Sequence, residues 1–367
     1  MKRFGFLYEK VVSVDNCRLA ILNASQNKRK RKMVKDVCDN LEDYAKDLSE
    51  RLSRMDFLSP YKTRFIKDGL SGKERELQIP AFYPDQCAHH AIMQVLKPII
   101  ERSSYHWSCA NIPKRGIDHA SKGVERATVR DRKHAKYCVK MDISKFYPSI
   151  PHGKLKARLR EKIKDEKFLQ IIFKVIDSHE QGLPIGNYTS PWLAELYLQP
   201  LDNLIKQKHR IQHYVRYADD LVLIDSNKRK LRKALHDIFE FVGELGLSIK
   251  HDYQLFRIQQ YCKDRSGRRG RKIDFVGRCF GVGFTTIRKR RALALMRQSR
   301  FIQKLQRENR PIAYRIASGF ISRCACFKHT NSYAMRKKYC ETVNIKKLKE
   351  VISNESKRKC LSQLAHH

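Results

Sequence analysis

The sequence lacks any long apolar run. No stretch approaches about 18 uninterrupted apolar residues, the length that a helix needs to cross a bilayer, so no membrane span is expected. The first residues also lack the apolar core and small-residue cleavage site of a signal peptide. These absences argue against a membrane-embedded or exported protein, and we expect a cytoplasmic location with no membrane partner.

Cysteine is present but forms no disulfide framework in the sequence. The 11 cysteines are an odd number and are scattered along the chain, which is typical of reduced thiols in a cytosolic protein. Cys324 and Cys326, with His329 nearby, have the residue types of a metal site. Their segment has a helical pattern and no second ligand pair is evident, so we interpret them as packed thiols.

Acidic side chains are scarce relative to basic ones. The chain has 38 Asp and Glu against 77 Lys and Arg in 367 residues, which gives a net charge of +39. Such an excess needs a polyanionic partner, and nucleic acid is the usual one, although ribosomal and membrane-surface proteins share the bias. Apolar residues make up 41% of the chain, which indicates a folded protein long enough for two or three domains.

The hydrophobic pattern predicts helices at both ends of the chain. Residues 1–70 are helical and polar, and their basic run Lys28–Lys32 is either a solvated face or an RNA-contacting arm. The pattern is helical and very basic again from residue 288 to near the end. Further helices are predicted over residues 84–103, 153–176, 192–209 and 228–246.

Strand patterns occupy the middle of the sequence. Residues 137–143 alternate like a half-buried strand, and Phe146–Ile150 follows as a turn and loop. His213–Asp225 reads as two apolar strands joined by a tight acidic turn, and Ile273–Ile287 as a hairpin with glycines at its bends. The fold class is therefore α+β, with a helical C-terminal appendage.

Two adjacent carboxylates lie at the tip of the predicted hairpin. Asp219 and Asp220 stand between apolar runs, where buried acids are costly unless a cation neutralises them, although a lone acidic pair is usually an ordinary Asx-type turn. Neighbours on a strand face opposite ways, so we expect one acid to face the site and the other to support it. Asp142, which ends another apolar strand, is the best companion.

Oxygen ligands that converge from two strands suit Mg²⁺. Two such ions, about 3.5–4 Å apart, would activate a 3′-hydroxyl and stabilise a pyrophosphate leaving group. The predicted cofactor is therefore two Mg²⁺ ions, with Mn²⁺ as an alternative. The predicted ligands are Asp142, Asp219, Asp220 and the backbone carbonyl of Ile143.

Several segments in the same order resemble the motifs of reverse transcriptases. KMDISKFYPSI, GLPIGNYTSPWLAELYL, RYADDLVLI and DFVGRCF resemble motifs A, B, C and E, and Lys73-Glu-Arg75 ahead of QIPAFYPDQCAHHAI resembles the fingers motif. FISRCACFKHTNSYAMRKKY resembles the thumb helix of stand-alone bacterial enzymes, and the resemblance spans roughly residues 60–345. It implies a right-hand polymerase with fingers, an antiparallel palm sheet and a helical thumb.

This resemblance implies a division of the chain and a set of substrates. Residues 1–70 would form an N-terminal helical basic region, residues 71–285 the fingers and palm, and residues 286–367 the thumb. The partners would be a noncoding template RNA, the DNA product and dNTPs, with an accessory protein or a second copy of the chain in addition.

The resemblance also assigns roles to individual residues. Asp142, Asp219 and Asp220 would be the catalytic, metal-binding acids. Tyr147 would lie under the incoming sugar and exclude a 2′-hydroxyl, with Phe146 as the competing candidate. Lys73 and Arg75 would hold the triphosphate, against the alternative that they are surface charges. The nucleic-acid contacts would come from Tyr217, Arg336, Lys337 and Lys338.

Spacing fixes the position of the motif B glycine. The motif runs Gln-Gly, three residues, then Ser-Pro, so counting back from Ser190-Pro191 puts Gly186 in the glycine slot and Ile185 where Gln is expected. Gln181-Gly182 is then a turn before the loop. The glycine lets a nucleotide approach the backbone closely.

The Ile-Gly version of this loop resembles diversity-generating retroelement enzymes and related bacterial defence enzymes. Pro191 departs from the usual diversity-generating pattern, which has Ser-Gln at that place. Motif D departs as well, because Tyr253 occupies the usual lysine position and leaves Lys250 or His251 as the proton donor to pyrophosphate, unless both are surface residues.

Three functions are compatible with these observations. The first is a compact bacterial reverse transcriptase that copies its own noncoding RNA, in antiphage defence or diversity generation. The second is an RNA-dependent RNA polymerase, which a bulky Tyr147 disfavours, and the third is a non-enzymatic RNA-binding scaffold, which the three intact acids disfavour. No segment after residue 345 is large enough for an RNase H, endonuclease or maturase domain, so we do not expect a mobile intron enzyme.

Overall fold

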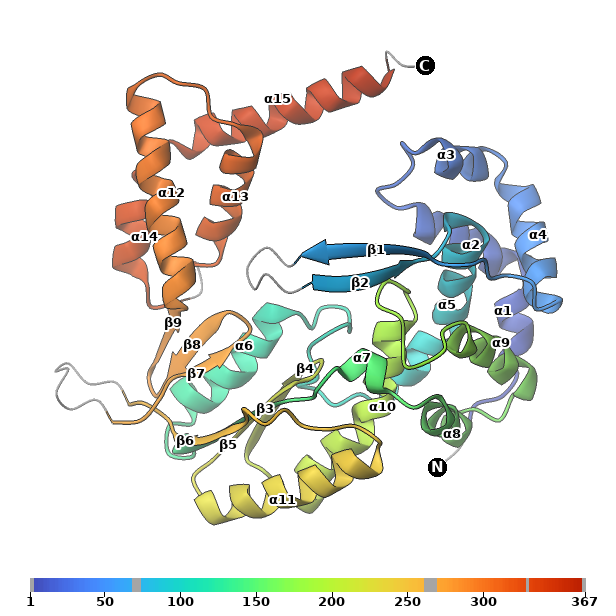
Figure 1. Cartoon of the computed structure of the whole chain (residues 1–367), viewed down its shortest axis with the longest axis horizontal. Coiled ribbons are helices and arrows are strands. Elements are labelled where there is room, and N and C mark those ends of the chain that lie inside the picture. The colour runs from blue at the N-terminus through green and yellow to red at the C-terminus, as the bar shows by residue number, and fades with distance from the viewer. Residues whose placement is uncertain (1–2, 68–73, 261–268, 328–329, 365–367) are drawn as a thin grey trace. The chain divides into compact units, whose positions relative to one another are not determined.

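The computed structural model describes residues 3–67, 74–260, 269–327 and 330–364 of the chain (Figure 1). Its internal contacts define two compact units. Unit 1 combines Met1–Ala120 with Val139–Gln254, and unit 2 combines Ser121–Cys138 with Leu255–His367. The predicted division of the chain at residues 70 and 285 stays a prediction.

Unit 1 begins with a helical layer. The helices α1 (Tyr8–Val12), α2 (Val14–Ser25), α3 (Lys32–Asp39) and α4 (Leu41–Ser53) precede the long helix α5 (Cys87–Ser103). The buried face of α2 packs against α4 and α5, and the Ser13 hydroxyl accepts a hydrogen bond from the Asn16 amide to cap α2. The predicted core helix over residues 84–103 is confirmed, with a short wide helical turn, η1 (Phe82–Gln86), at its start.

The predicted helical run over residues 1–70 is wrong at its end. Residues 62–67 form the strand β1 (Lys62–Lys67), which pairs antiparallel with β2 (Glu74–Ile79). Alternating β-prone residues such as Thr63 and Phe65 favour the strand, and the pairing with β2 outweighs the local helical signal. Both strands are largely exposed, which leaves their side chains available to solvent.

The central sheet has four strands in the order β4-β5-β3-β6. The predicted strand and hairpin are confirmed as β3 (Tyr137–Asp142), β4 (His213–Tyr217) and β5 (Asp220–Asp225), with β6 (Gln254–Arg257) beyond them. The register of β4 and β5 pairs Tyr217 with Asp220, which leaves only two residues for the turn. The apolar residues of both strands, such as Tyr214, Val222 and Leu223, are buried and anchor the hairpin in the core.

Two predictions in unit 1 need correction. The predicted helix over residues 153–176 is two helices, α8 (His152–Lys162) and α9 (Glu166–Asp177). Residues between them pair with the N-terminal segment, since the amide of Lys164 donates to the carbonyl of Phe4, 2.8 Å away. Asp165 then caps α9 by accepting from the Phe168 amide.

The second correction concerns the segment after β3. Phe146–Ser149 forms a single helical turn, α7, where a turn and loop are predicted. Lys145 has a positive φ of 42°, and its carbonyl accepts from the Ser149 amide at 3.0 Å, which closes the turn. The predicted helices over residues 192–209 and 228–246 are confirmed as α10 (Ser190–Asn203), extended by η3 (Leu204–Lys208), and α11 (Lys228–Glu244).

Unit 2 holds a small sheet and a helical bundle. The predicted hairpin over residues 273–287 has three strands, β7 (Ile273–Phe275), β8 (Arg278–Gly281) and β9 (Phe284–Ile287), because Gly277 and Gly283 make two reversals. The helix α6 (Ile117–Glu125) leads into the short segment η2 (Arg126–Arg130). The C-terminal helices are α12 (Lys289–Arg307), α13 (Tyr314–Ala325), α14 (Tyr333–Tyr339) and α15 (Ile345–Leu364).

The helical bundle has its own apolar core, which includes Leu295, Ile302 and Phe320. The interpretation of Cys324 and Cys326 as packed thiols agrees with their place against this core, while His329 lies outside the described residues. Among the residues that the structure describes, no helix is both long enough and apolar enough to cross a membrane.

Candidate active site

The ends of β3 and of the β4-β5 hairpin bring three carboxylates together. Asp142 is the last residue of β3, and Asp219 lies in the two-residue turn between the paired residues Tyr217 and Asp220. The amide of Ile143 donates to the carbonyl of Asp219 at 3.1 Å, which ties the two strand ends to each other. The predicted acids therefore converge from two strands of one sheet.

The acids differ in their electrostatic surroundings. Burial raises the pKa of Asp219, and the negative charge of Asp142 raises it further. Asp220 points towards Lys140, whose Nζ lies 3.9 Å from its Oδ2. Asp219 and Asp142 thus share a site in which their charges repel, and Asp220 has a cation of its own.

The donor set fits a hard divalent cation. Asp142, Asp219 and Asp220 are half-buried residues at two strand ends, and their carboxylate oxygens are the type of ligand that Mg²⁺ prefers. A cation placed there would remove the repulsion that raises the pKa of Asp219. Ile143 follows Asp142 directly, and its amide donates to the carbonyl of Asp219, so its backbone lies next to both acids.

Lys250 supplies a positive charge at this site. Its ammonium group forms an ion pair with Asp142, and its amide donates to the Asp142 carbonyl at 2.9 Å. Burial lowers the pKa of Lys250, but the hydrogen bond and charge of Asp142 outweigh burial and raise it overall. His251, the other predicted candidate, is exposed, and Tyr253 stacks its ring edge against Phe239.

Tyr147 and Phe146 have different surroundings. Phe146 is 4% exposed and belongs to the core, whereas Tyr147 is half-buried. Burial raises the pKa of the Tyr147 hydroxyl, and the charge of Asp219 raises it further, which places that hydroxyl near the acids. Tyr147 also shares a hydrogen bond with Asn111. Of the two predicted candidates, Tyr147 therefore faces the site.

The motif B loop contains two glycines that cannot be replaced without strain. Gly186 has a φ of 131°, and a Cβ there would lie 2.1 Å from the Gln78 carbonyl oxygen. The Gln78 amide donates to the Ile185 carbonyl at 2.9 Å, so the loop is bonded to β2. Gly182 has a φ of 69° and abuts Pro148, which agrees with its interpretation as a turn.

The loop is closed at its far end by the Ser-Pro pair. The Ser190 hydroxyl donates to the Pro184 carbonyl at 2.7 Å, and Pro191 lies in the first turn of α10. Ile185 is half-buried and Gly186 is exposed. The exposed backbone at Gly186 is therefore open to close approach by a ligand.

A buried ionic network lies behind the acidic turn. Arg216, 1% exposed, donates through Nε and Nη2 to Asp202 at 2.8 and 2.6 Å, and through Nη2 to Glu195 at 3.1 Å. Its Nη1 donates to the carbonyl of Ala218 at 3.3 Å. The Ser108 hydroxyl donates to the other oxygen of Glu195 at 2.8 Å, so the carboxylates are held on both sides.

We did not predict this network from the sequence, although two signals were present. Arg216 interrupts an apolar strand directly before the acidic turn. Glu195 and Asp202 are seven residues apart in a mostly apolar helix, a spacing that puts both on one face.

The remaining predicted residues lie on three elements. Arg75 lies on β2. Burial and the charge of Asp142 raise the pKa of Asp219, whereas the charge of Arg75 opposes them, so Arg75 is near the acids. Lys73 lies outside the described residues. Tyr217 is half-buried at the end of β4. These positions leave the assigned roles of Arg75 and Tyr217 as predictions.

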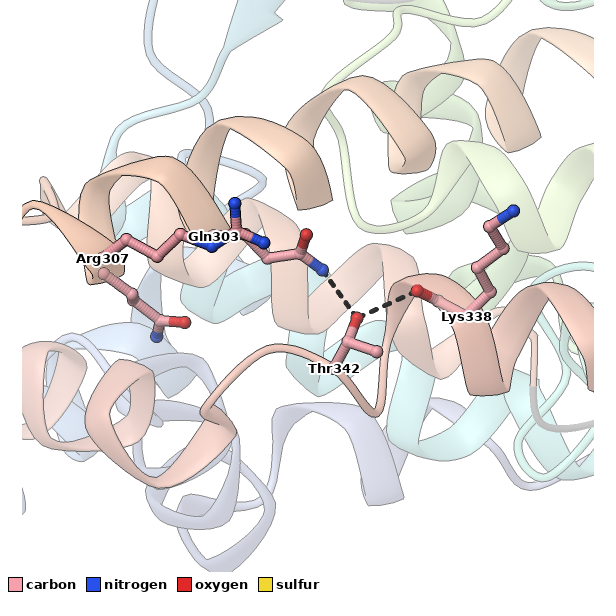
Figure 2. Close-up of a pocket in the computed structure, with 5 residues that line it drawn as sticks. Gln303, Arg307, Lys338 and Thr342 are labelled. Atoms are coloured by element: carbon pink, nitrogen blue, oxygen red, sulfur yellow. Dashed lines mark hydrogen bonds between the residues drawn. The ribbon is translucent and has the colours of Figure 1, made fainter.

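The predicted thumb cations lie on α14. Arg336 forms an ion pair with Glu341, at 3.2 Å. Lys338 lines a cavity of about 390 Å³ together with Arg307 and Thr342 (Figure 2). The structure adds a second basic element, because the exposed cations of α12 are Lys289, Arg290, Arg297, Arg300, Lys304 and Arg307.

The fold and the site define a class of protein. Three acids on adjoining strand ends of an antiparallel hairpin sheet, with a half-buried Tyr and a glycine loop beside them, are the palm of a right-hand nucleic-acid polymerase. The family model described as "Reverse transcriptase (RNA-dependent DNA polymerase)" matches residues 71–258, which is more than half of the chain. The chain belongs to this family, and the predicted α+β right-hand fold is confirmed.

Two of the curated relatives that the chain matches come from Escherichia coli. Protein YkfC is 23% identical over 222 residues, which cover 49% of this chain and 58% of YkfC. Retron Ec73 reverse transcriptase is 31% identical over 137 residues, which cover 34% of this chain and 43% of the retron protein. The chain thus spans about half the length of these relatives. The resemblance to bacterial reverse transcriptases is confirmed at the level of the family.

Among solved structures, the telomerase of Candida albicans in complex with a fragment of telomeric RNA is similar. The similarity has a TM-score of 0.48 at 11% identity, and covers 84% of this chain and 57% of the telomerase chain.

Proposed function

We propose that the protein is an RNA-directed DNA polymerase that extends a DNA strand from dNTPs on a dedicated noncoding RNA template. The observation that carries this proposal is the convergence of Asp142, Asp219 and Asp220 at the joined ends of β3 and the β4-β5 hairpin. The family match supports the reaction class, and the net charge of +39 supports a nucleic-acid partner.

In this proposal Asp142, Asp219, Asp220 and the Ile143 carbonyl hold two Mg²⁺ ions, with Mn²⁺ as an alternative. When bound, the ions supply activation of the attacking 3′-hydroxyl and charge stabilisation at the reacting phosphate. The turn geometry holds Asp219 in place, since the Ile143 amide and the Arg216 guanidinium bind the carbonyls of Asp219 and Ala218. Pre-positioned acids of this kind need no rearrangement when the substrate arrives.

Other side chains of the chain handle the nucleotide. Arg75 binds the triphosphate through charge-assisted hydrogen bonds, together with Lys73, which lies outside the described residues. Lys250 carries its proton at Nζ beside Asp142, and we assign it as the donor to the leaving pyrophosphate. His251 is exposed, which disfavours it for this role.

We assign discrimination between deoxyribose and ribose to Tyr147. Its side chain hydrogen-bonds with Asn111 and is close enough to Asp219 to feel its charge, while Phe146 is buried in the core, so we assign the bound sugar to the Tyr147 ring. A bulky ring at this place excludes a 2′-hydroxyl by contact. Ile185 and Gly186 present an apolar side chain and open backbone to the nascent base pair.

The wider assignment covers template, partners and role. Arg336, Lys337 and Lys338 on α14 and the exposed cations of α12 bind duplex phosphates, and Tyr217 contacts the nucleic acid next to the acids. The role is antiphage defence or diversity generation, with an accessory protein or a second copy as partner. Relatives that include retron reverse transcriptases support a bacterial setting. A cytoplasmic location, where RNA and dNTPs meet, belongs to the same proposal.

Extension of a primed RNA template tests this function. Purified protein receives Mg²⁺ and labelled dNTPs or rNTPs, alongside an Asp219→Asn/Asp220→Asn variant. The matched control is Asp39→Asn/Asp43→Asn, because these acids are exposed on α3 and α4. We expect dNTP extension by the wild type and the control, and loss in the active-site variant. Extension that survives the active-site change would overturn the assignment.

A further inference from the structure

Two aromatic rings from distant segments stack at the motif B loop. Tyr188, two residues after Gly186, lies flat on His90 of α5, with ring centroids 4.0 Å apart and planes 3° apart. Tyr188 is 39% exposed although it is a large apolar ring. The pair therefore presents an open aromatic surface next to the loop that we assign to the nascent base pair.

Lys28, in the turn that follows α2, lies near this pair, because its charge acts on His90. Gln86 and His90 are four residues apart across the start of α5, so they lie on the same face. Lys28 donates from Nζ to Gln86 Oε1 at 2.8 Å. Burial lowers the pKa of His90 to about 4, and the charge of Lys28 contributes, so His90 is neutral at pH 7 and stacks without adding charge.

Exposed cations surround Lys28 in sequence. We define the basic turn as Lys28–Lys32, which connects α2 to the first turn of α3. Arg29, Arg31 and Lys32 are exposed, and within the described residues none of these three forms an ion pair. Cations that no acid neutralises remain free to bind a phosphate backbone.

We propose that the Tyr188–His90 pair and the basic turn form a binding track for the single-stranded extension of the template, which rests on the polymerase function proposed above. An exposed aromatic ring can stack on an unpaired base, whereas a paired base is already stacked in its duplex. Cations bind the phosphates of any sequence. The combination of stacking surface and cationic groove is the usual way to hold a single strand without reading its sequence.

The track also has a direction. Gly186 and Tyr188 belong to the same short loop, Tyr188 stacks on His90, and Lys28 is bonded to Gln86, one helical turn before His90. An unpaired template that leaves the nascent base pair at Gly186 meets the aromatic pair first and the basic turn second.

Stacking is tested with catalytically inactive protein, so that polymerase activity plays no part. The Asp219→Asn/Asp220→Asn variant is titrated into an RNA duplex with a single-stranded 5′ extension that carries 2-aminopurine. A second probe is the same duplex with a blunt end. We expect the 2-aminopurine fluorescence to fall on binding.

Added to that background, Tyr188→Ala should weaken binding of the extended RNA about 10-fold and abolish the quenching, because stacking on one ring contributes about 1–3 kcal/mol. Tyr188→Phe should keep both, and blunt duplex binding should not change in either variant. Equal binding of the extended RNA by the Tyr188→Ala and Tyr188→Phe proteins, with thermal melting unchanged, would overturn the stacking surface.

The basic turn is tested by salt dependence. Replacing Arg29, Arg31 and Lys32 with Gln should lower the slope of log affinity against log salt by about 2 for the extended RNA, at about 0.7 per phosphate contact. The matched control replaces Arg229, Arg232 and Lys233, which are exposed on α11, with Gln. Identical slopes for the two triple variants would overturn the track. Both the stacking test and the salt test measure RNA binding and not catalysis. A protein without extension activity would therefore contradict the proposed polymerase function but not the binding track.

Discussion

The buried guanidinium of Arg216 donates a hydrogen bond to the carbonyl of Ala218, 3.3 Å away. Ala218 has a φ of 55°, in the left-handed region, and Asp219 follows it directly. The same guanidinium is held by Asp202 and Glu195 on α10. The helix after the motif B loop thus fixes the turn that carries Asp219.

Replacing Arg216 with Met should destabilise the fold and the site together. It leaves Asp202 and Glu195 buried without their cation, which costs about 3–5 kcal/mol in free energy of unfolding. Arg216→Lys should recover part of this, since it keeps the charge but not the planar fork. Urea unfolding measures the effect, and adding Glu195→Gln and Asp202→Asn to Arg216→Met should restore stability. Unchanged stability of the single variant would contradict the network.

Replacing Gly186 with Ala should impair extension more than folding. The new Cβ would lie 2.1 Å from the Gln78 carbonyl in an exposed loop, so the loop must move away from β2. We expect at least a 10-fold loss in the rate of extension, measured by single-turnover kinetics. Gly243→Ala, in α11 with open space around it, serves as control and should stabilise the helix slightly. Equal rates for the two variants would show that the loop does not position substrate.

Replacing Lys250 with Met should lower the rate constant of extension by about 10²–10⁴-fold, the usual contribution of a general acid. The ion pair with Asp142 places Lys250 at the acids, whereas the adjacent His251 is exposed. His251→Gln is the matched control and should leave the rate unchanged. Rapid-quench measurements over a range of pH separate the two. A larger loss in the His251 variant would move the proton-donor role to that residue.

Stability should fall as the pH is lowered below about 6.5. His89 is fully buried, burial lowers its pKa from 6.5 to about 3, and in the described structure neither ring nitrogen has a hydrogen-bond partner. At pH values between about 3 and 6.5, His89 binds a proton in the unfolded chain but not in the folded chain. The free energy of unfolding therefore decreases as pH falls, by about 1.4 kcal/mol per pH unit from this group.

Urea unfolding between pH 7 and pH 4 measures this dependence. His89→Leu should remove that share of the slope, while His251→Leu, at an exposed position, should leave it in place. Parallel slopes for the wild type and the His89 variant would show that this histidine is protonated in the folded state.

Much of the site could be predicted because its signals are local in sequence. Alternating apolar residues and two acids at a tip are enough to locate the hairpin with Asp219, and the spacing to Ser190-Pro191 is enough to single out Gly186. The antiparallel pairing of β4 and β5 needs only a two-residue turn between them.

The features that we did not predict depend on contacts between distant segments. The break between α8 and α9 arises where Phe4 pairs with the residues around Lys164, some 160 positions away in sequence. The clash that requires glycine at residue 186 comes from Gln78 on β2. Neither contact leaves a periodic signal in one sequence.

Selective incorporation of dNTPs on an RNA template tests the central claim most directly. Single-turnover extension is measured with dNTPs and with rNTPs for the wild type, Asp142→Asn and Tyr147→Ala. The account predicts strong preference for dNTPs in the wild type, loss of extension with either substrate in Asp142→Asn, and incorporation of rNTPs by Tyr147→Ala. Wild-type protein that prefers rNTPs, or an Asp142→Asn variant that extends as well as the wild type, would contradict it.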